Sequence, residues 1–371
     1  MPTDAGPEGA AKRLADGQGL RMALGVWTPF VLGMGFNWPF AFLGAVFAAL
    51  FLQAPSPPSP KAGAMLIATA FALLLMGFVV FSVLLPYPAS FLLAQALMIG
   101  WGFSLSVSGK SPLLVVLALM DALMMPYMAR LSLDVAWTLA LWLPINMGIA
   151  LLSCWAVFAL FPPAAMSAEQ EAAVEAPPPF DPERRLLRMM LVTLPFVALF
   201  ILFDSGAILT LIFVAILAQQ LAASTGAGPA VAKGMLLANI AGGLVAILCY
   251  ELVVSATNFG FMAVIAGLLC LGFARWFTSA HVSAALAGSA LTTALILFGG
   301  AMAPFGGDVE GKMLSRLVQV GAALVWVLTA FVAVDYFLPE REKRPGDPSG
   351  GPKRRVRPGR VRIARSEAPP G

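Results

Sequence analysis

Long apolar runs dominate this sequence and restrict where it can fold. A helix that spans a bilayer needs roughly 17 to 25 mostly apolar residues, and runs of that kind fill most of the 371 residues. The chain is 60% hydrophobic and only 11% charged, which is more apolar surface than a water-facing shell could cover. We therefore expect the lipid bilayer as the partner of the chain and no separate soluble domain.

Apolar runs bounded by Pro, Gly and charged residues predict twelve transmembrane helices and an all-α polytopic membrane protein. The predicted spans of the first half are roughly 21–37, 39–53, 64–85, 90–107, 112–129 and 136–161. Those of the second half are roughly 187–203, 205–220, 231–254, 259–277, 283–304 and 316–337.

The placement of Lys and Arg predicts the orientation, because short cytoplasmic loops carry an excess of both. With twelve spans and a cytoplasmic N-terminus, 20 of the 23 Lys and Arg lie on the cytoplasmic side. The short helix pairs 21–53 and 187–220 could each be a single crossing instead. With twelve spans, 10 of the Lys and Arg outside the basic tail are cytoplasmic and 3 are external, whereas merging each pair into one crossing gives 6 cytoplasmic and 7 external. The rule therefore favours twelve spans with both termini in the cytoplasm.

The start of the first span returns in the second half of the chain. "LRMALGVWTPF" at 20–30 reappears as "LRMMLVTLPF" at 187–196. At an offset of 170 further identities follow, among them Met65, Leu66 and Ala68 with Met235, Leu236 and Ala238. Six spans per half is an even number, so the sequence predicts two tandem six-helix repeats in parallel orientation, 21–162 and 187–338. Such a pair can form a pathway at its seam, and duplication without a transport seam is the alternative.

Three polar segments flank these repeats. Residues 1–20 lack the apolar core of a signal peptide and form the expected cytoplasmic N-terminus. Residues 163–186 are Pro-rich and acidic, as in a cytoplasmic linker. Residues 339–371 form a basic, disordered cytoplasmic tail with ten Lys/Arg and four Asp/Glu. This tail either fixes topology or contacts anionic lipid headgroups, and without aromatic residues or a folded platform it does not predict nucleic-acid binding.

Asp121, in "ALMDALMM", is the most informative single residue because it lies near the middle of the fifth predicted span. A carboxylate at mid-bilayer costs about 2.5 to 3.5 kcal/mol on insertion scales. It should therefore face the protein interior, take up a proton or meet a partner. We predict a proton-coupling or substrate-gating group, and a structural hydrogen bond between helices is the alternative.

Five further polar residues are candidates for the pathway. Asn146 and Gln319 are related by an offset of 173, and each lies two residues before a Gly. They and Asn239 could line a pathway or join helices by hydrogen bonds. Arg21 and Arg188 open the two repeats. They could form a basic cytoplasmic vestibule for an anionic substrate or serve as topology anchors at the membrane surface.

Other chemistry finds little support in the sequence. "GGDVEGKM" at 306–313 has Met where a P-loop needs Ser or Thr, so no nucleotide-driven motor is expected. His281 is the single histidine, and Cys154, Cys249 and Cys270 lie in apolar runs without CxxC spacing. We therefore expect neither a metal site, a cofactor nor an enzyme active site.

Each half combines an Arg at the cytoplasmic edge, an apolar hairpin broken by a polar or aromatic turn ("GFNWPFAF", "FDSGAIL") and a Gln near the hairpin end, Gln53 or Gln219. With the six-span duplication, this resembles the fusaric acid resistance and aromatic acid exporter superfamily. It looks closest to a short, membrane-only bacterial branch known as a domain of unknown function. The chain departs from the larger members, which carry a soluble cytoplasmic domain after each membrane half.

The resemblance implies export of aromatic carboxylates and similar small molecules across the bacterial inner membrane, together with a periplasmic adaptor (membrane fusion) protein. We therefore predict a proton-driven efflux transporter, with a homo-oligomer as a further assembly to consider. A passive anion channel, a membrane accessory subunit and an integral-membrane enzyme are the alternatives. The enzyme lacks a second buried acid, His or metal ligand at useful spacing from Asp121.

Overall fold

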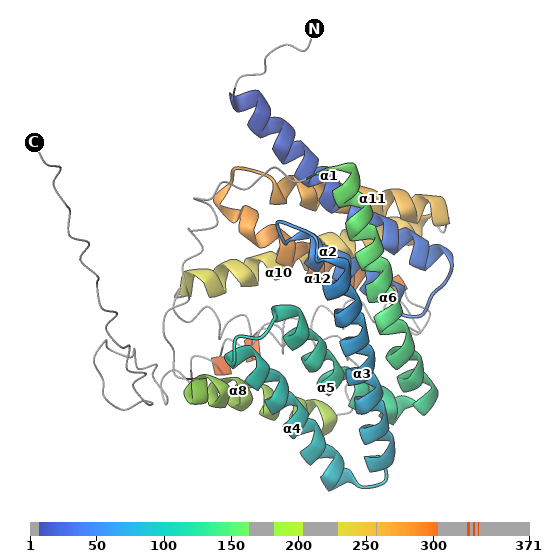
Figure 1. Ribbon diagram of the computed structural model, residues 1–371, viewed down its shortest axis with the longest axis vertical. Helices are drawn as coiled ribbons and strands as arrows, with labels where there is room; N and C mark the ends of the chain where they lie inside the picture. Colours follow the sequence, from blue (N-terminus) through green and yellow to red (C-terminus); the bar gives the residue numbers. More distant parts are fainter. Residues whose placement is uncertain are drawn as a thin grey trace, which may run out of the picture.

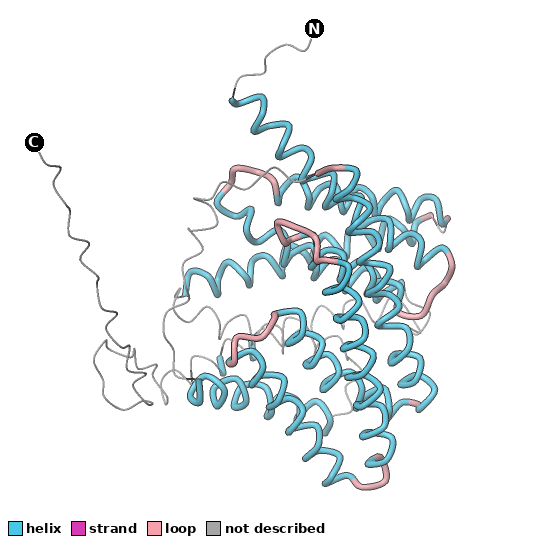
Figure 2. Tube along the Cα trace, in the orientation of Figure 1, coloured by secondary structure: helices cyan, strands magenta, loops and turns pink. Residues whose placement is uncertain are grey.

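In the computed structural model, the described residues are 7–162, 182–202, 229–256 and 258–302, together with 325, 326, 329, 330 and 333. Every regular element within them is helical, and short loops join these helices (Figure 2). The elements are α1 (Pro7–Gly35), α2 (Ala41–Leu52), α3 (Pro60–Leu84), α4 (Pro88–Val107), α5 (Pro112–Leu131), α6 (Leu133–Leu160), α8 (Pro182–Leu202), α10 (Pro229–Ser255), α11 (Phe259–Phe277), η1 (Val282–Leu286) and α12 (Ala287–Met302).

The helices form two groups that do not follow the order of the chain (Figure 1). One group contains α1 and α2 with α10, α11 and α12. The other contains α3, α4 and α5 with α8. Helix α6 runs along both groups and contacts α1, α2, α3 and α5. The first helices of each predicted repeat therefore pack on helices of the other repeat.

Local sequence explains where several helices begin. Ser59 caps α3 by accepting a hydrogen bond from the Ala62 backbone N–H at 3.2 Å, and Asn258 caps α11 in the same way through Gly260 at 2.7 Å. Pro occupies the first turn of α3, α4 and α5, where its missing N–H costs no helical hydrogen bond.

Seven described helices are long and apolar enough to cross a membrane. They are Pro60–Leu84, Pro88–Val107, Leu113–Leu131, Leu133–Leu160, Leu237–Ser255, Phe259–Phe277 and Ser283–Met302. The bounds of α11 are those predicted for span 259–277. The span predicted at 283–304 divides into η1 and α12.

The first predicted pair of spans differs most from the structure. Helix α1 begins at Pro7, within the predicted polar N-terminus, and α2 has only 12 residues. Such a helix is about 18 Å long, whereas a bilayer core is about 30 Å thick. The helix formed by the segment predicted to span at 39–53 is therefore shorter than the bilayer core is thick, because the chain turns at residues 36–40.

Other predictions fall on parts of the chain that the structure does not describe. The predicted span 205–220 and residues 163–181 of the predicted linker lie outside the described residues. The remaining part of that linker belongs to α8, which begins at Pro182. Within the predicted span 316–337, the five described positions are helical.

Helices α1 and α11 lie antiparallel along most of their length. Gly19 lies next to Thr278 and Gly35 lies against the ring of Phe259. Between these ends, the Trp27 indole N–H donates to the Ala263 carbonyl at 2.7 Å. This contact joins the first helix of one predicted repeat to the fourth helix of the other.

Candidate functional site

Asp121 lies at the centre of α5. This helix is the most buried of the seven candidate spans, because 72% of its apolar segment is buried inside the protein. The Asp121 side chain is 0% exposed. Neither carboxylate oxygen has a hydrogen-bond partner among the described residues. A charge in such surroundings is strongly destabilised, so the group must take up a proton or meet a partner that these residues do not supply.

The Asp121 side chain occupies a space on α3 where Gly77 has no side chain, which we name the Gly77 notch. A Cβ atom on Gly77 would contact Oδ1 of Asp121 and would lie 2.7 Å from Oδ2 and 2.8 Å from Cγ. Any other residue at position 77 would therefore collide with the carboxylate. The pairing of Gly77 with Asp121 is what allows a carboxylate to be packed at this depth.

Close packing on α4 holds α5 in position. Gly102 of α4 lies against the side chain of Leu119, at a distance of 2.9 Å from the position that its Cβ would take. Residues 119 and 121 lie about 200° apart around a helix, so Leu119 faces α4 while Asp121 faces α3. Helix α5 is thus wedged between α3 and α4, with its carboxylate toward the α3 side.

Pro126 leaves a backbone carbonyl close to Asp121 without its helical donor. It lies inside α5 and has no N–H to donate to the carbonyl of Ala122, four residues earlier. Freed carbonyls and interrupted helices at membrane depth are found where they line a cavity or are satisfied by neighbours. The Ala122 carbonyl belongs to the residue after Asp121, so both groups occupy the same turn of α5.

Gln95 on α4 and Thr193 on α8 are two buried polar residues that the sequence reasoning missed. They are 2% and 1% exposed. Oε1 of Gln95 and Oγ1 of Thr193 have no hydrogen-bond partner among the described residues. Since α4 contacts both α5 and α8, these atoms and Asp121 belong to one group of helices. Each is a polar residue in an apolar helix, a signal that helical wheels of α4 and α8 could have shown.

Asn146 on α6 is 1% exposed and joins α6 to the α1–α2 turn. Its side-chain amide donates to the Pro39 carbonyl at 3.0 Å and to the Trp142 carbonyl at 2.8 Å. The turn itself contains two residues with positive φ, Asn37 and Phe40, and positive φ is unusual for a bulky side chain such as Phe. The contacts of Asn146 match the alternative of a hydrogen bond between helices. A role in lining a pathway stays a prediction.

Asn239 on α10 accepts a hydrogen bond from Oγ1 of Thr293 on α12 at 2.5 Å. Both side chains are 4% exposed, so this bond is part of the core of the group that holds α10, α11 and α12. Gln319, the predicted counterpart of Asn146, lies outside the described residues.

Arg21 and Arg188 have different surroundings. The Arg21 guanidinium donates to the Phe161 carbonyl at 2.8 Å and lies 5.0 Å from the centre of the Phe158 ring. It therefore satisfies a carbonyl at the C-terminal end of α6, as an anchor would. Arg188 is 3% exposed on α8. The predicted vestibule formed by both arginines stays a prediction.

Ser153 on α6 supplies a hydrogen bond that a proline has removed. Pro29 lies inside α1 and leaves the Gly25 carbonyl without its helical donor. The hydroxyl of Ser153 donates to that carbonyl at 2.9 Å. Sequence reasoning missed Ser153, although an internal Pro in an apolar helix indicates that a neighbouring donor is needed.

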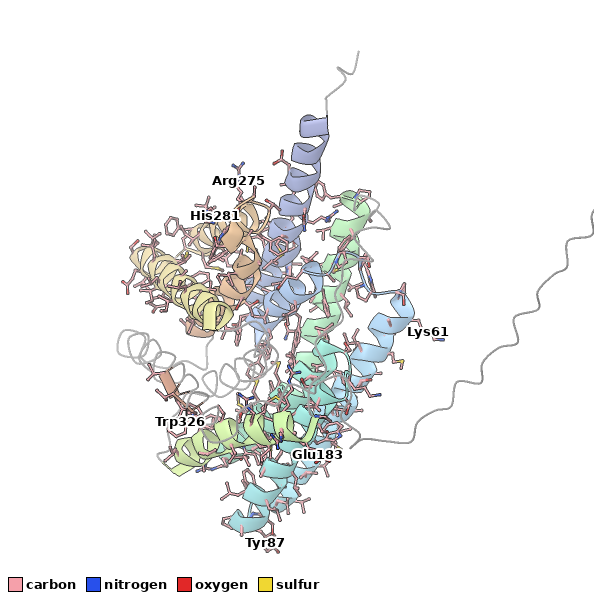
Figure 3. All side chains as sticks on the ribbon, turned by 90° about the vertical axis from the view of Figure 1, so that its left-hand side faces the viewer. Lys61, Tyr87, Glu183, Arg275, His281 and Trp326 are labelled. Atoms are coloured by element: carbon pink, nitrogen blue, oxygen red, sulfur yellow. The ribbon has the colours of Figure 1, made fainter. Side chains whose placement is uncertain are left out.

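A related bond occurs in the second half, where it reaches the Val192 carbonyl, one residue beyond the Leu191 carbonyl that Pro195 leaves without its helical donor. Pro195 lies inside α8, as Pro29 does in α1. The indole N–H of Trp326 donates to the Val192 carbonyl at 3.1 Å, and Figure 3 shows Trp326 beside α8. At the offset of 173, Trp326 is the counterpart of Ser153. Each half therefore has a donor that reaches the backbone of its Pro-containing first helix from the matching position.

The helix contacts between halves are also reciprocal. Helix α1 packs on α11, and α8, the counterpart of α1, packs on α4, the counterpart of α11. In the second contact, Gly100 of α4 lies against the end of the Met190 side chain at 3.1 Å from its Cβ position. Two halves related by a two-fold axis would make such a pair of contacts.

In the described ranges, no group of three or more His, Cys, Asp or Glu side chains is placed to hold a metal ion. Cys154, Cys249 and Cys270 are buried free thiols.

Comparison with known proteins gives one result. The model of an uncharacterised family, described as "Protein of unknown function (DUF2955)", matches residues 18–159. This stretch runs from within α1 nearly to the end of α6 and lies close to the predicted first repeat. No curated protein matches the chain, and no solved structure does. The chain is thus similar, over its first six helices, to a family without an assigned function.

Proposed function

We propose that this protein is a bacterial inner-membrane transporter that exports small amphipathic or aromatic carboxylates and is driven by protons. The observation that carries the proposal is Asp121, a fully buried carboxylate without a hydrogen-bond partner in the most buried candidate span. A carboxylate in this position is unfavourable for stability alone. A cycle of proton uptake and release gives it a use.

The arrangement of the halves supports this proposal. We infer twelve spans in two six-helix repeats of parallel orientation, related by a two-fold axis along the membrane normal. The reciprocal contacts of α1 with α11 and of α8 with α4, and the bonds of Ser153 and Trp326, are what such a duplication would produce. Both repeats would then contribute to one seam, along which a substrate could pass.

The proposed orientation has the N- and C-termini in the cytoplasm. In support, Arg21 contacts the C-terminal end of α6 at Phe161, and Gly19 lies beside Thr278 after α11. The end of the predicted cytoplasmic N-terminus thus lies beside Phe161, just before the predicted linker, and beside Thr278. Delivery to a periplasmic adaptor protein completes the proposal, on the basis of the resemblance to aromatic acid exporters.

Transport into inside-out vesicles tests this function. We expect a panel of aromatic and aliphatic carboxylates to include at least one that accumulates in vesicles containing the protein, and an uncoupler should abolish this accumulation. Asp121→Asn should remove it at equal protein level. Asp134→Asn is the control, because Asp134 is an exposed carboxylate in the first turn of the neighbouring helix α6.

The alternatives predict different results. Flux that persists with the uncoupler and in Asp121→Asn would identify a passive anion channel. Absence of any flux, together with co-purification of a membrane partner, would identify an accessory subunit.

A further inference from the structure

Side-chain contacts place the first two helices of the chain with helices of the second predicted repeat. The Trp27 indole N–H of α1 donates to the Ala263 carbonyl of α11 at 2.7 Å. Helix α2 packs on α12, where the side-chain amide of Gln53 lies directly on Gly288. Helices α10 and α11 also contact α12. In space, α1 and α2 therefore belong with α10, α11 and α12 (Figure 1).

Helix α6 is tied to α1 and α2 by hydrogen bonds at three levels. Asn146 and Ser153 donate to carbonyls of the α1–α2 turn and of α1 at 3.0 and 2.9 Å. The Phe161 carbonyl, directly after α6, accepts from Arg21 of α1 at 2.8 Å. These bonds extend from residue 146 to residue 161, about 22 Å of helix, so they fix both the position and the tilt of α6 relative to α1.

Toward α3, helix α6 makes a different kind of contact. Trp155 lies against Gly63, and the rings of Trp137 and Phe78 have centroids 5.3 Å apart. The Trp155 indole N–H donates to the Pro58 carbonyl at 2.8 Å, but this carbonyl belongs to the connection that precedes α3. Apolar surfaces of packed helices can slide on each other by small amounts, whereas hydrogen bonds hold their partners within a narrow range of distance and angle.

The second half shows the same grouping with the halves exchanged. Helix α8 packs on α4, with the end of the Met190 side chain against Gly100. Trp326, in the last predicted span, donates to the Val192 carbonyl of α8 at 3.1 Å. The first and sixth spans of each half are thus bonded to each other, and the first span of each half packs on the fourth span of the other.

We propose that the protein moves in its transport cycle as two mixed units and not as its two sequence repeats. Unit A contains α1, α2, α6, α10, α11 and α12, and unit B contains α3, α4, α5 and α8 together with Trp326. The units slide on each other where α6 meets α3 and α5. In the described part of the chain they are joined by residues 53–59 and by Ser132, whose extended backbone separates α5 from α6. The inference rests on the proposed function for the use of this movement, but the composition of the units does not depend on it.

The position of Asp121 connects the units with the proposed proton cycle. Asp121 lies between α5 and α3 in unit B, and both of these helices contact α6 of unit A. The carboxylate whose charge changes in the proposed function is therefore carried by the helices on which α6 slides.

Hydrogen exchange of the full chain in lipid nanodiscs tests the composition of the units without requiring transport. Trp27→Phe removes one hydrogen bond of unit A and keeps an aromatic ring. Because helices of one cooperative unit open together, exchange should become about two- to tenfold faster in the helices of unit A and stay unchanged in α3, α4 and α5. Trp326→Phe should do the reverse, with faster exchange in α8, α3, α4 and α5.

Trp101→Phe is the control, because the Trp101 side chain is exposed on α4, and it should leave exchange unchanged in both units. Faster exchange in Trp27→Phe that spreads into α3, α4 and α5 but not into α10, α11 and α12 would overturn the proposal, since it would follow the sequence repeat.

Cross-links give an independent test during transport. Gly19→Cys with Thr278→Cys joins α1 to the end of α11, across the repeats but within unit A; the Cβ position of Gly19 lies 3.5 Å from Oγ1 of Thr278. Ile67→Cys with Gly148→Cys joins α3 to α6, within one repeat but across the units; the Cβ position of Gly148 lies 3.5 Å from Cδ1 of Ile67. A short bifunctional thiol reagent should leave vesicle uptake unchanged with the first pair and abolish it with the second.

The wild type treated with the same reagent is the control, because its own cysteines are buried. Loss of uptake with the first pair would overturn the proposal, and so would full uptake with the second pair. An exchange pattern that follows the units, in a chain that transports none of the carboxylates, would support the units while refuting the proposed function.

Discussion

Replacing Ser153 with Ala should destabilise the protein through one carbonyl. Ser153 donates to the Gly25 carbonyl at 2.9 Å, and Pro29 has removed the helical donor of that carbonyl. In Ser153→Ala the Gly25 carbonyl is left buried and without a donor. The substitution itself removes little volume, so the lost hydrogen bond should account for nearly the whole effect.

The expected cost is about 1 to 2 kcal/mol. Leaving a buried acceptor without a donor costs about 1 to 3 kcal/mol, whereas hydrogen bonds between membrane helices average about 0.6 and reach about 1.7 kcal/mol. The upper part of this second range applies because the Gly25 carbonyl has no alternative donor. In a Pro29→Ala background, residue 29 regains its N–H, and Ser153→Ala should then cost less than about 0.5 kcal/mol.

A double-mutant cycle measures this difference. The four chains are unfolded in mixed micelles with increasing SDS and followed by far-ultraviolet circular dichroism. The coupling free energy between positions 29 and 153 should be about 1 kcal/mol. Ser82→Ala is the control, because Ser82 donates to the Phe78 carbonyl within α3 and should change stability little. An equal cost of Ser153→Ala in both backgrounds would refute the reasoning.

Three further substitutions test contacts of the site in the same unfolding assay. Gly77→Ala should cost about 1 to 3 kcal/mol by overpacking, and clearly less in an Asp121→Ala background; an equal cost would mean that the carboxylate does not occupy the notch. Asn146→Ala should speed hydrogen exchange in the α1–α2 turn and cost about 1 kcal/mol, and unchanged exchange would contradict the role of its bond to that turn. Thr293→Val should cost about 0.6 to 1.7 kcal/mol, while Thr292→Val, whose hydroxyl bonds within its own helix, should be nearly neutral; equal effects would argue against the bond to α10.

Sequence patterns predicted the helices well where polar residues mark their ends. Asn258 and the polar residues after Phe277 delimit α11, and the prediction gave its bounds. The same reasoning did not anticipate how short the helix at 39–53 is, because hydropathy shows that residues are apolar but does not distinguish a long crossing helix from a short helix packed inside the protein. All but one of the 12 residues of α2 are buried, which an apolar pattern without alternation cannot reveal.

For the site, the sequence identified the residue whose presence is most costly. Asp121 stands out because a carboxylate interrupts an apolar run. Its neighbour Gly77 did not, since Gly is common in membrane helices. Its importance comes from the packing of α3 on α5. Contacts such as α1 with α11 join residues more than 200 positions apart, and no local pattern contains that information.

The contact between Trp27 and Ala263 also bears on how the protein is made. The two residues are 236 positions apart, and at about 5 to 20 residues per second the ribosome needs about 12 to 47 s to add that length of chain. Arg21 meets Phe161 after 140 residues, about 7 to 28 s after its own synthesis. Helix α1 is therefore synthesised first but can form its contact with α6 only after Phe161 has been added to the chain. Its contact with α11 can form only later still, after the second half has been made as far as Ala263.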